Sequence, residues 1–232
     1  TKTAPVFRSR WDAELTAKIY RNAPVLIEEG KPGGNPWGVD FRQGLFNMTS
    51  DSHLFKTAAD LERDAFVRDG TDWVQPGARP AQGALGVEGG GAGSLDLTGG
   101  GPRAAKRYVP LYEAKMIHQF DHRWATYDAD GQSSADVTLD QKKAPEFEPT
   151  PRYWVPAAEV DARLAAKGWK RGWLMGWRDI ARATDERTVI STVFPKVGVG
   201  NKLPLMFPNN EPEQIAALAA NFSALAFDFA SR

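Results

Sequence analysis

Two histidines separated by three residues form the first candidate for chemistry, in the segment His118-Gln119-Phe120-Asp121-His122. In zinc hydrolases this spacing places two imidazoles on one face of a helix, and here Asp121 offers a third ligand. The glutamate that serves as general base directly after the first histidine is replaced by Gln119. We therefore expect a hydrogen-bonded polar turn, with metal binding by His118, Asp121 and His122 as the alternative.

Glu113 and Lys115 form a second candidate, because Glu-x-Lys is half of a metal-dependent nuclease site. In such sites a carboxylate holds Mg²⁺ and a lysine stabilises the charge that develops during the reaction. A second acid is needed on a neighbouring strand, and the available one is Asp96. A nuclease that uses Glu113 and Lys115 is therefore one alternative function.

Residues 83–101 contain nine glycines in nineteen positions. A glycine turn that binds a cofactor follows a buried strand, and the preceding Ala84-Leu85-Gly86-Val87 is a poor strand. We expect a loop that separates an N-terminal segment, residues 1–82, from residues 102–232, although both parts can also form one continuous domain. With three histidines and no cysteine, the sequence contains no convincing catalytic group, so no catalytic residue and no metal ligand is assigned.

Aromatic residues alternate with cations in the C-terminal half, which is a pattern that can stack on bases and hold phosphates. The segments are Tyr153-Trp154, Trp169-Lys170-Arg171-Gly172-Trp173 and Trp177-Arg178-Asp179. A strand with tryptophans toward the core and cations toward water produces the same pattern. The pattern alone leaves both interpretations open.

The charges are balanced but segregated along the chain. Lys and Arg total 29 and Asp and Glu total 29, whereas a dedicated nucleic-acid binder is usually basic. Residues 163–187 nevertheless carry seven cations against three anions, and residues 102–127 carry five against two. Residues 128–148 carry six acids and two lysines. This segregation permits one basic face on a neutral protein.

The periodicities predict an α+β fold, in which a mixed sheet region has flanking helices, long loops and a C-terminal amphipathic helix. Helices are expected over 11–22, over 58–67 with Thr57 as N-cap, over 157–167 closed by Gly168, and from Asn210 to Phe229. Strands are expected at 25–27, within 37–46 and 108–128, and over 169–180 and 188–194. No apolar run is long enough to cross a membrane and no signal segment is visible, so we expect a cytoplasmic protein.

The stretch Tyr108-Val-Pro-Leu-Tyr-Glu-Ala-Lys-Met-Ile-His-Gln-Phe-Asp-His-Arg-Trp-Ala-Thr-Tyr127 resembles a signature of large adenine-specific DNA methyltransferases. These enzymes belong to type II (IIG-like) restriction–modification and related phage-defence systems. Further segments resemble the family in the same order, and they lie at residues 5–20, 37–38, 46–52, 151–155, 177–190 and 222–232. The upstream cofactor-binding and Asn-Pro-Pro-aromatic motifs are absent, so the resemblance implies a fragment that contains the target-recognition region without the catalytic core.

The resemblance implies that this chain binds double-stranded DNA, while the core of the same polypeptide binds S-adenosylmethionine and accepts a flipped adenine. No cofactor is expected in the chain itself. Phosphate contacts are expected from Lys170, Arg171, Arg182 and Lys196. Base contacts are expected from Lys115, Gln119, Arg123, Arg178 and Arg187. Two alternatives stay open. The arginines can instead pair with Asp121, Asp179 and Glu186 inside the fold, and the chain can instead be a structural docking domain for the methyltransferase core.

Overall fold

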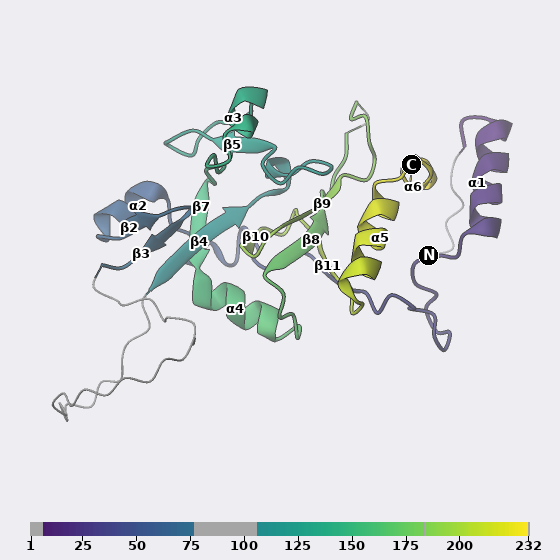
Figure 1. Cartoon of the computed structure of the whole chain (residues 1–232), viewed down its shortest axis with the longest axis horizontal. Coiled ribbons are helices and arrows are strands. Elements are labelled where there is room, and N and C mark those ends of the chain that lie inside the picture. Colours follow the sequence, from purple (N-terminus) through teal and green to yellow (C-terminus); the bar gives the residue numbers. More distant parts are fainter. Residues whose placement is uncertain (1–6, 77–105, 183, 232) are drawn as a thin grey trace.

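The computed structural model of the chain describes residues 7–76, 106–182 and 184–231, so the predicted glycine-rich loop 83–101 lies outside the described residues. The helices are α1 (Arg10–Asn22), α2 (Ala58–Arg63), α3 (Leu139–Lys143), α4 (Ala157–Ala165), α5 (Pro212–Phe222) and α6 (Leu225–Ala230), with short 3-10 turns η1 (Ser52–Leu54) and η2 (Ala114–Met116). The strands are β1 (Asp40–Arg42), β2 (Val67–Asp69), β3 (Asp72–Val74), β4 (Arg107–Tyr112), β5 (Ala125–Tyr127), β6 (Ser134–Asp136), β7 (Tyr153–Pro156), β8 (Trp173–Trp177), β9 (Ser191–Pro195), β10 (Gly198–Val199) and β11 (Leu205–Phe207). Helices and mainly antiparallel strands thus confirm the predicted α+β class (Figure 1).

Strand β8 lies inside a four-stranded antiparallel sheet with the order β1-β11-β8-β9. Successive side chains of a strand point to opposite faces. Leu174 accordingly joins the central core, while the next residue, Met175, packs on the other face beneath α5. The buried side chains of β8 and β11 are therefore apolar on both faces, whereas β9 also buries Ser191 and Thr192.

Strand β4 organises the second sheet. It pairs with β7 along one edge, while β3 and β10 pair with its beginning and its end. Strand β2 extends this sheet beyond β3. Because β4 is held on both sides, the segment that follows it starts from a fixed position.

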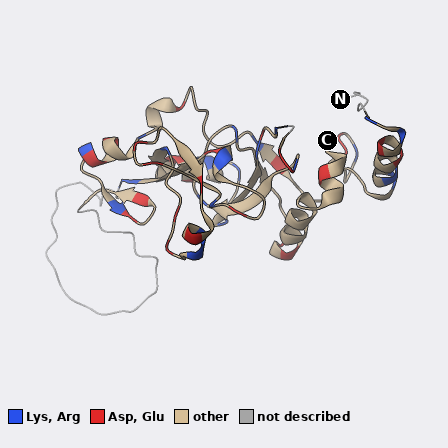
Figure 2. Cartoon of the chain, turned by 90° about the horizontal axis from the view of Figure 1, so that it is seen from above, with Lys and Arg blue, Asp and Glu red and all other residues tan. Residues whose placement is uncertain are grey.

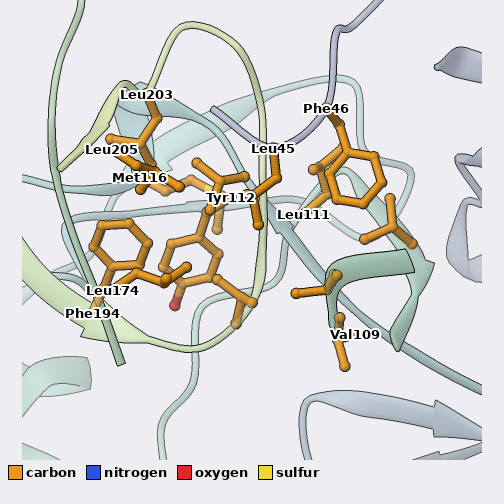
Figure 3. Packing of buried hydrophobic residues seen from close by; sticks show 14 of the residues in the cluster. Leu45, Phe46, Val109, Leu111, Tyr112, Met116, Leu174, Phe194, Leu203 and Leu205 are labelled. Carbon is orange, nitrogen blue, oxygen red and sulfur yellow. The ribbon is translucent and has the colours of Figure 1, made fainter. Parts of the chain in front are cut away.

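The central core lies between the two sheets and includes Leu111 and Tyr112 of β4 together with Leu174 and Phe194 of β8 and β9 (Figure 3). Helix α2 covers the outer face of the second sheet through Leu61, and α5 covers the outer face of the first sheet. Figure 1 shows these layers in succession along the long axis, with α1 at the far end beside α6. None of the helices in the described ranges reaches the length and hydrophobicity that a membrane span requires.

Local sequence signals set several helix ends. Thr57 caps α2 as predicted, because its hydroxyl accepts from the Asp60 amide and the Asp60 side chain accepts from the Thr57 amide. The helix ends before the predicted residue 67, since Ala65 adopts a left-handed φ of 60°. Gly168 has a φ of 68° and closes the turn after α4, again as predicted.

The predicted C-terminal amphipathic helix is confirmed in α5, but its predicted limits, Asn210 to Phe229, are wrong, because the segment forms two helices. The N-cap is Glu211, and the chain leaves the helix at Ala224, whose ψ is 142°, before α6 begins. The buried carboxylate of Asp228 accepts hydrogen bonds from the amides of Thr188 and Val189 at 2.7 and 2.8 Å. This long-range contact fixes the direction of α6 independently of α5. The expected strand at 25–27 is also absent, and these residues form an irregular segment.

Residues before and after the glycine-rich segment share both sheets. Strand β1 pairs with β11, and β3 pairs with β4, whose Tyr108 lies opposite Trp73. The described residues of the N-terminal segment and of residues 102–232 therefore contribute to the same two sheets and to one central core.

Candidate nucleic-acid interface

Six of the cations predicted to contact DNA lie at opposite ends of the β8–β9 hairpin. Trp173 pairs with Pro195 at one end and Trp177 pairs with Ser191 at the other. Lys170, Arg171 and Lys196 belong to the first end, whereas Arg178, Arg182 and Arg187 belong to the connection at the second. Figure 2 shows basic and acidic segments interspersed along the molecule, so the fold does not collect every cation on one face.

One end of the hairpin forms a basic pocket, which we define by Lys170, Arg171, Lys196, Trp169 and Asp161. These residues line a single depression of about 190 Å³. Lys170 and Arg171, which follow α4, are thus brought together with Lys196 at the end of β9, and all three were predicted to hold phosphates. The pocket contains three cations and one carboxylate, which suits it to an anionic ligand.

Arg171 is fixed within this pocket by its neighbours. Its Nη2 donates to the backbone oxygen of Asn210 at 2.6 Å, and its guanidinium carbon lies 5.6 and 5.4 Å from the ring centroids of Trp169 and Trp173. Trp169 is held in turn, because its Nε1 donates to the Trp173 oxygen at 2.7 Å. The aromatic and cationic groups of the pocket therefore form a preorganised unit.

The two lysines of the basic pocket differ in their partners. The Nζ of Lys196 forms an ion pair with Asp161 at 2.8 Å. Lys170 is exposed, and within the described residues its ammonium has no hydrogen-bond or ion-pair partner. Lys170 can therefore meet an incoming anion without breaking an existing contact.

The histidine segment forms a tight turn, as predicted, rather than one face of a helix. The amides and carbonyls of His118 and Asp121 exchange two hydrogen bonds, at 2.7 and 2.9 Å, with Gln119 and Phe120 between them. Asp121 is bound to the Nζ of Lys142 at 2.6 Å and to the Arg123 amide at 2.8 Å. The Asp121 carboxylate therefore stabilises the turn through these two contacts.

The two histidines lie in the packed surroundings of this turn. Burial is the main cause that lowers the pKa of both His118 and His122 below the ordinary value of 6.5. The ring of His118 lies 4.2 Å from that of Trp124. Within the described residues no group of three His, Asp or Glu side chains is placed to hold a metal ion.

Three residues predicted to read bases donate instead to backbone carbonyls. Arg123 donates to the oxygens of Lys142, Ala144 and Phe147, which follow or end helix α3. Arg178 donates twice to the oxygen of Ile117, and Arg187 donates to that of Ser223 at 3.4 Å. Two of the acids named as alternative partners of the arginines pair with lysines, since Asp121 pairs with Lys142 and Asp179 pairs with Lys202.

Glu113 and Lys115 both contact Tyr127. The Tyr127 hydroxyl donates to Glu113 Oε1 at 2.7 Å, and the Lys115 Nζ lies 4.5 Å from the centroid of the Tyr127 ring. Burial, and then the hydrogen bond to Glu113, raise the pKa of Tyr127. Lys115 stays exposed, and Asp96, the second acid that a nuclease site needs, lies outside the described residues.

The remaining predicted residues are Arg182 and Gln119. Arg182 is exposed, and its amide donates to Asp185. The Gln119 side-chain nitrogen is buried without a hydrogen-bond partner among the described residues. Sequence reasoning did not select Phe120, although this residue is the most exposed large hydrophobic side chain described, at 78%. The signal available was its position between two polar residues inside a predicted turn.

Comparison of the chain with protein-family models, with curated proteins and with solved structures gave no match.

Proposed function

We propose that this chain is the double-stranded DNA-recognition region of an adenine-specific DNA methyltransferase of a type II restriction–modification or phage-defence system. The observation that carries the proposal is the basic pocket, which Lys170, Arg171 and Lys196 line together with Trp169. The resemblance of residues 108–127 to the signature of that family supports it from the sequence.

The basic pocket suits a phosphate of the DNA backbone. Arg171 presents a planar guanidinium beside two tryptophans, Lys170 adds an exposed ammonium, and Lys196 adds one that is paired with Asp161. Contacts of this kind position a protein on a duplex but carry no sequence information. Phosphate neutralisation releases counterions, so the affinity of the chain for DNA should fall steeply with salt.

Base reading requires exposed side chains with directional hydrogen bonds. Among the predicted residues Lys115 fits this role, because its ammonium is exposed beside a fixed ring. Arg123, Arg178 and Arg187 act by holding the backbone that presents the reading residues. Methyl transfer, with S-adenosylmethionine as donor, belongs to the catalytic core in this proposal, and that core and duplex DNA are the two partners of the chain. In this proposal the chain acts in the cytoplasm, together with these two partners.

The proposal is tested by fluorescence anisotropy of a labelled duplex titrated with the chain at several KCl concentrations. We expect saturable binding, and we expect Lys170→Ala to reduce the slope of log affinity against log salt by about 0.9 for one lost phosphate contact. Lys18→Ala, which removes an exposed lysine of α1, is the matched control and should leave the slope unchanged. Absence of binding, or equal effects of both variants, would contradict the proposal.

A further inference from the structure

The turn at Gln119 and Phe120 holds an aromatic side chain in an unfavourable backbone conformation. Phe120 has a φ of 62°, in the left-handed region that non-glycine residues rarely adopt. Its ring is 78% exposed, so packing in the core does not compensate for this conformation. The neighbouring Gln119 side-chain nitrogen is buried without a partner among the described residues. Two unfavourable features thus occur at adjacent residues.

The surroundings of the turn hold it rigidly in this state. Hydrogen bonds close the turn between His118 and Asp121, and the carboxylate of Asp121 is bound by Lys142 and by an amide. Just before the turn, Arg178 fixes the carbonyl of the fully buried Ile117. A strained residue persists only where its neighbours over-determine it, and such residues cluster at binding sites.

An aromatic side chain on a fixed turn has only two rotatable side-chain torsions, so it loses little conformational entropy when it contacts a flat surface. Proteins that deform DNA insert apolar side chains, phenylalanine among them, between neighbouring base pairs. The exposed ammonium of Lys115, on the 3-10 turn just before this tight turn, supplies a cation in the same segment of the chain. Base steps of a duplex are therefore a surface that fits the presented ring.

We propose that Phe120 is a stacking wedge, which inserts into the base stack when this chain binds duplex DNA. The inference rests on the proposed function and adds a residue that deforms the duplex. Insertion of the ring separates two neighbouring base pairs, and the exposed base faces then stack against the ring. No covalent step is involved.

The test compares two labelled duplexes of the same sequence, one intact and one with a single abasic site. The abasic site opens the base stack in advance, so a wedge binds there at lower cost whatever the recognised sequence is. The abasic site avoids most of the cost of separating stacked base pairs, which corresponds to a preference of about 5- to 150-fold. We expect the full 232-residue chain to prefer the abasic duplex by a factor in this range.

Variants then assign the preference to the ring. Phe120→Ala should remove the preference while binding to the intact duplex persists, and Phe120→Trp should retain it. Leu139→Ala removes another exposed apolar side chain, at 76% exposure on α3, and should behave as the unaltered chain does. Thermal unfolding of each variant verifies that it is folded.

The outcomes separate this inference from the proposed function. Binding to both duplexes with equal affinity, or a preference that survives in Phe120→Ala, overturns the wedge and leaves duplex binding intact. If Phe120→Ala changes no DNA affinity, the exposed ring is assigned to a protein contact instead. Failure of the chain to bind either duplex overturns both proposals.

Discussion

The guanidinium of Arg178 donates two hydrogen bonds to the carbonyl oxygen of Ile117, from Nε at 2.9 Å and from Nη2 at 2.7 Å. Arg178 directly follows β8, and Ile117 directly precedes the turn that presents Phe120. Burial lowers the pKa of the Arg178 guanidinium, and its Nε and Nη2 groups keep the Ile117 oxygen as their acceptor. This pair therefore fixes the turn to the end of the four-stranded sheet.

Arg178→Ala should destabilise the fold. The substitution leaves a buried carbonyl without its charged donor, which costs about 2–3 kcal/mol. Urea denaturation measures the change, with Arg182→Ala, an exposed residue of the same connection, as the control. A loss below about 0.5 kcal/mol, combined with weaker DNA binding, would instead indicate that Arg178 reads a base.

Phe120→Gly should leave the fold as stable as before or stabilise it slightly. Relief of the left-handed conformation is worth about 1–2 kcal/mol, and the extra freedom of glycine in the unfolded chain offsets about 0.5–1 kcal/mol of this. Ala65→Gly is the comparison, because Ala65 has a φ of 60° and is also exposed. A clear loss of stability for Phe120→Gly alone would show that the ring makes stabilising contacts.

Acidification should destabilise the protein through His118 and His122. Their pKa values are lowered in the folded chain, so the unfolded chain binds more protons below the ordinary value of 6.5. The stabilising contribution is complete above that pH and is lost as the pH falls through the folded-state pKa. Chemical denaturation between about pH 7.5 and about pH 5 should therefore show a falling free energy of unfolding.

Two histidine variants test whether His118 contributes to this pH dependence. His118→Gln should flatten the decline, because it removes one of the two groups. His53→Gln, which replaces an exposed histidine, should keep the decline of the unaltered chain. An unchanged profile in His118→Gln would contradict the assignment.

Asp161→Asn should strengthen binding to duplex DNA. The substitution releases Lys196 from its ion pair and removes the one carboxylate of the basic pocket. An exposed ion pair is worth about 0.2–1 kcal/mol, so the affinity should rise by about 1.5- to 5-fold. Glu159→Gln, which removes a carboxylate elsewhere on α4, is the matched control. An affinity for Asp161→Asn no higher than that of Glu159→Gln would contradict the use of this pocket by DNA.

Local sequence signals predicted the elements whose limits are set locally. Thr57 caps α2 and Gly168 closes the turn after α4, because caps depend on residues within one helical turn. The break at Ala224 could not be predicted in this way, since serine and alanine are compatible with a helix there. Hydrogen bonds from Thr188 and Val189 to Asp228, about forty positions apart, decide it.

The candidate site was predictable only in part for the same reason. Lys170 and Arg171 lie beside tryptophans in sequence, and the fold adds Lys196 to them through the pairing of β8 with β9. Arg178 also follows a tryptophan, but its partner is a carbonyl 61 positions away. Sequence spacing cannot distinguish an arginine that reaches a ligand from one that reaches a distant backbone oxygen.

Sequence-specific recognition of DNA is best measured by selection from a pool of duplexes with a randomised centre. The chain is incubated with the pool, bound duplexes are recovered and amplified over several rounds, and the selected sequences are determined. We expect enrichment of one motif that contains an adenine, and weaker enrichment with Lys115→Ala. A pool that stays random although duplexes are retained would contradict sequence recognition.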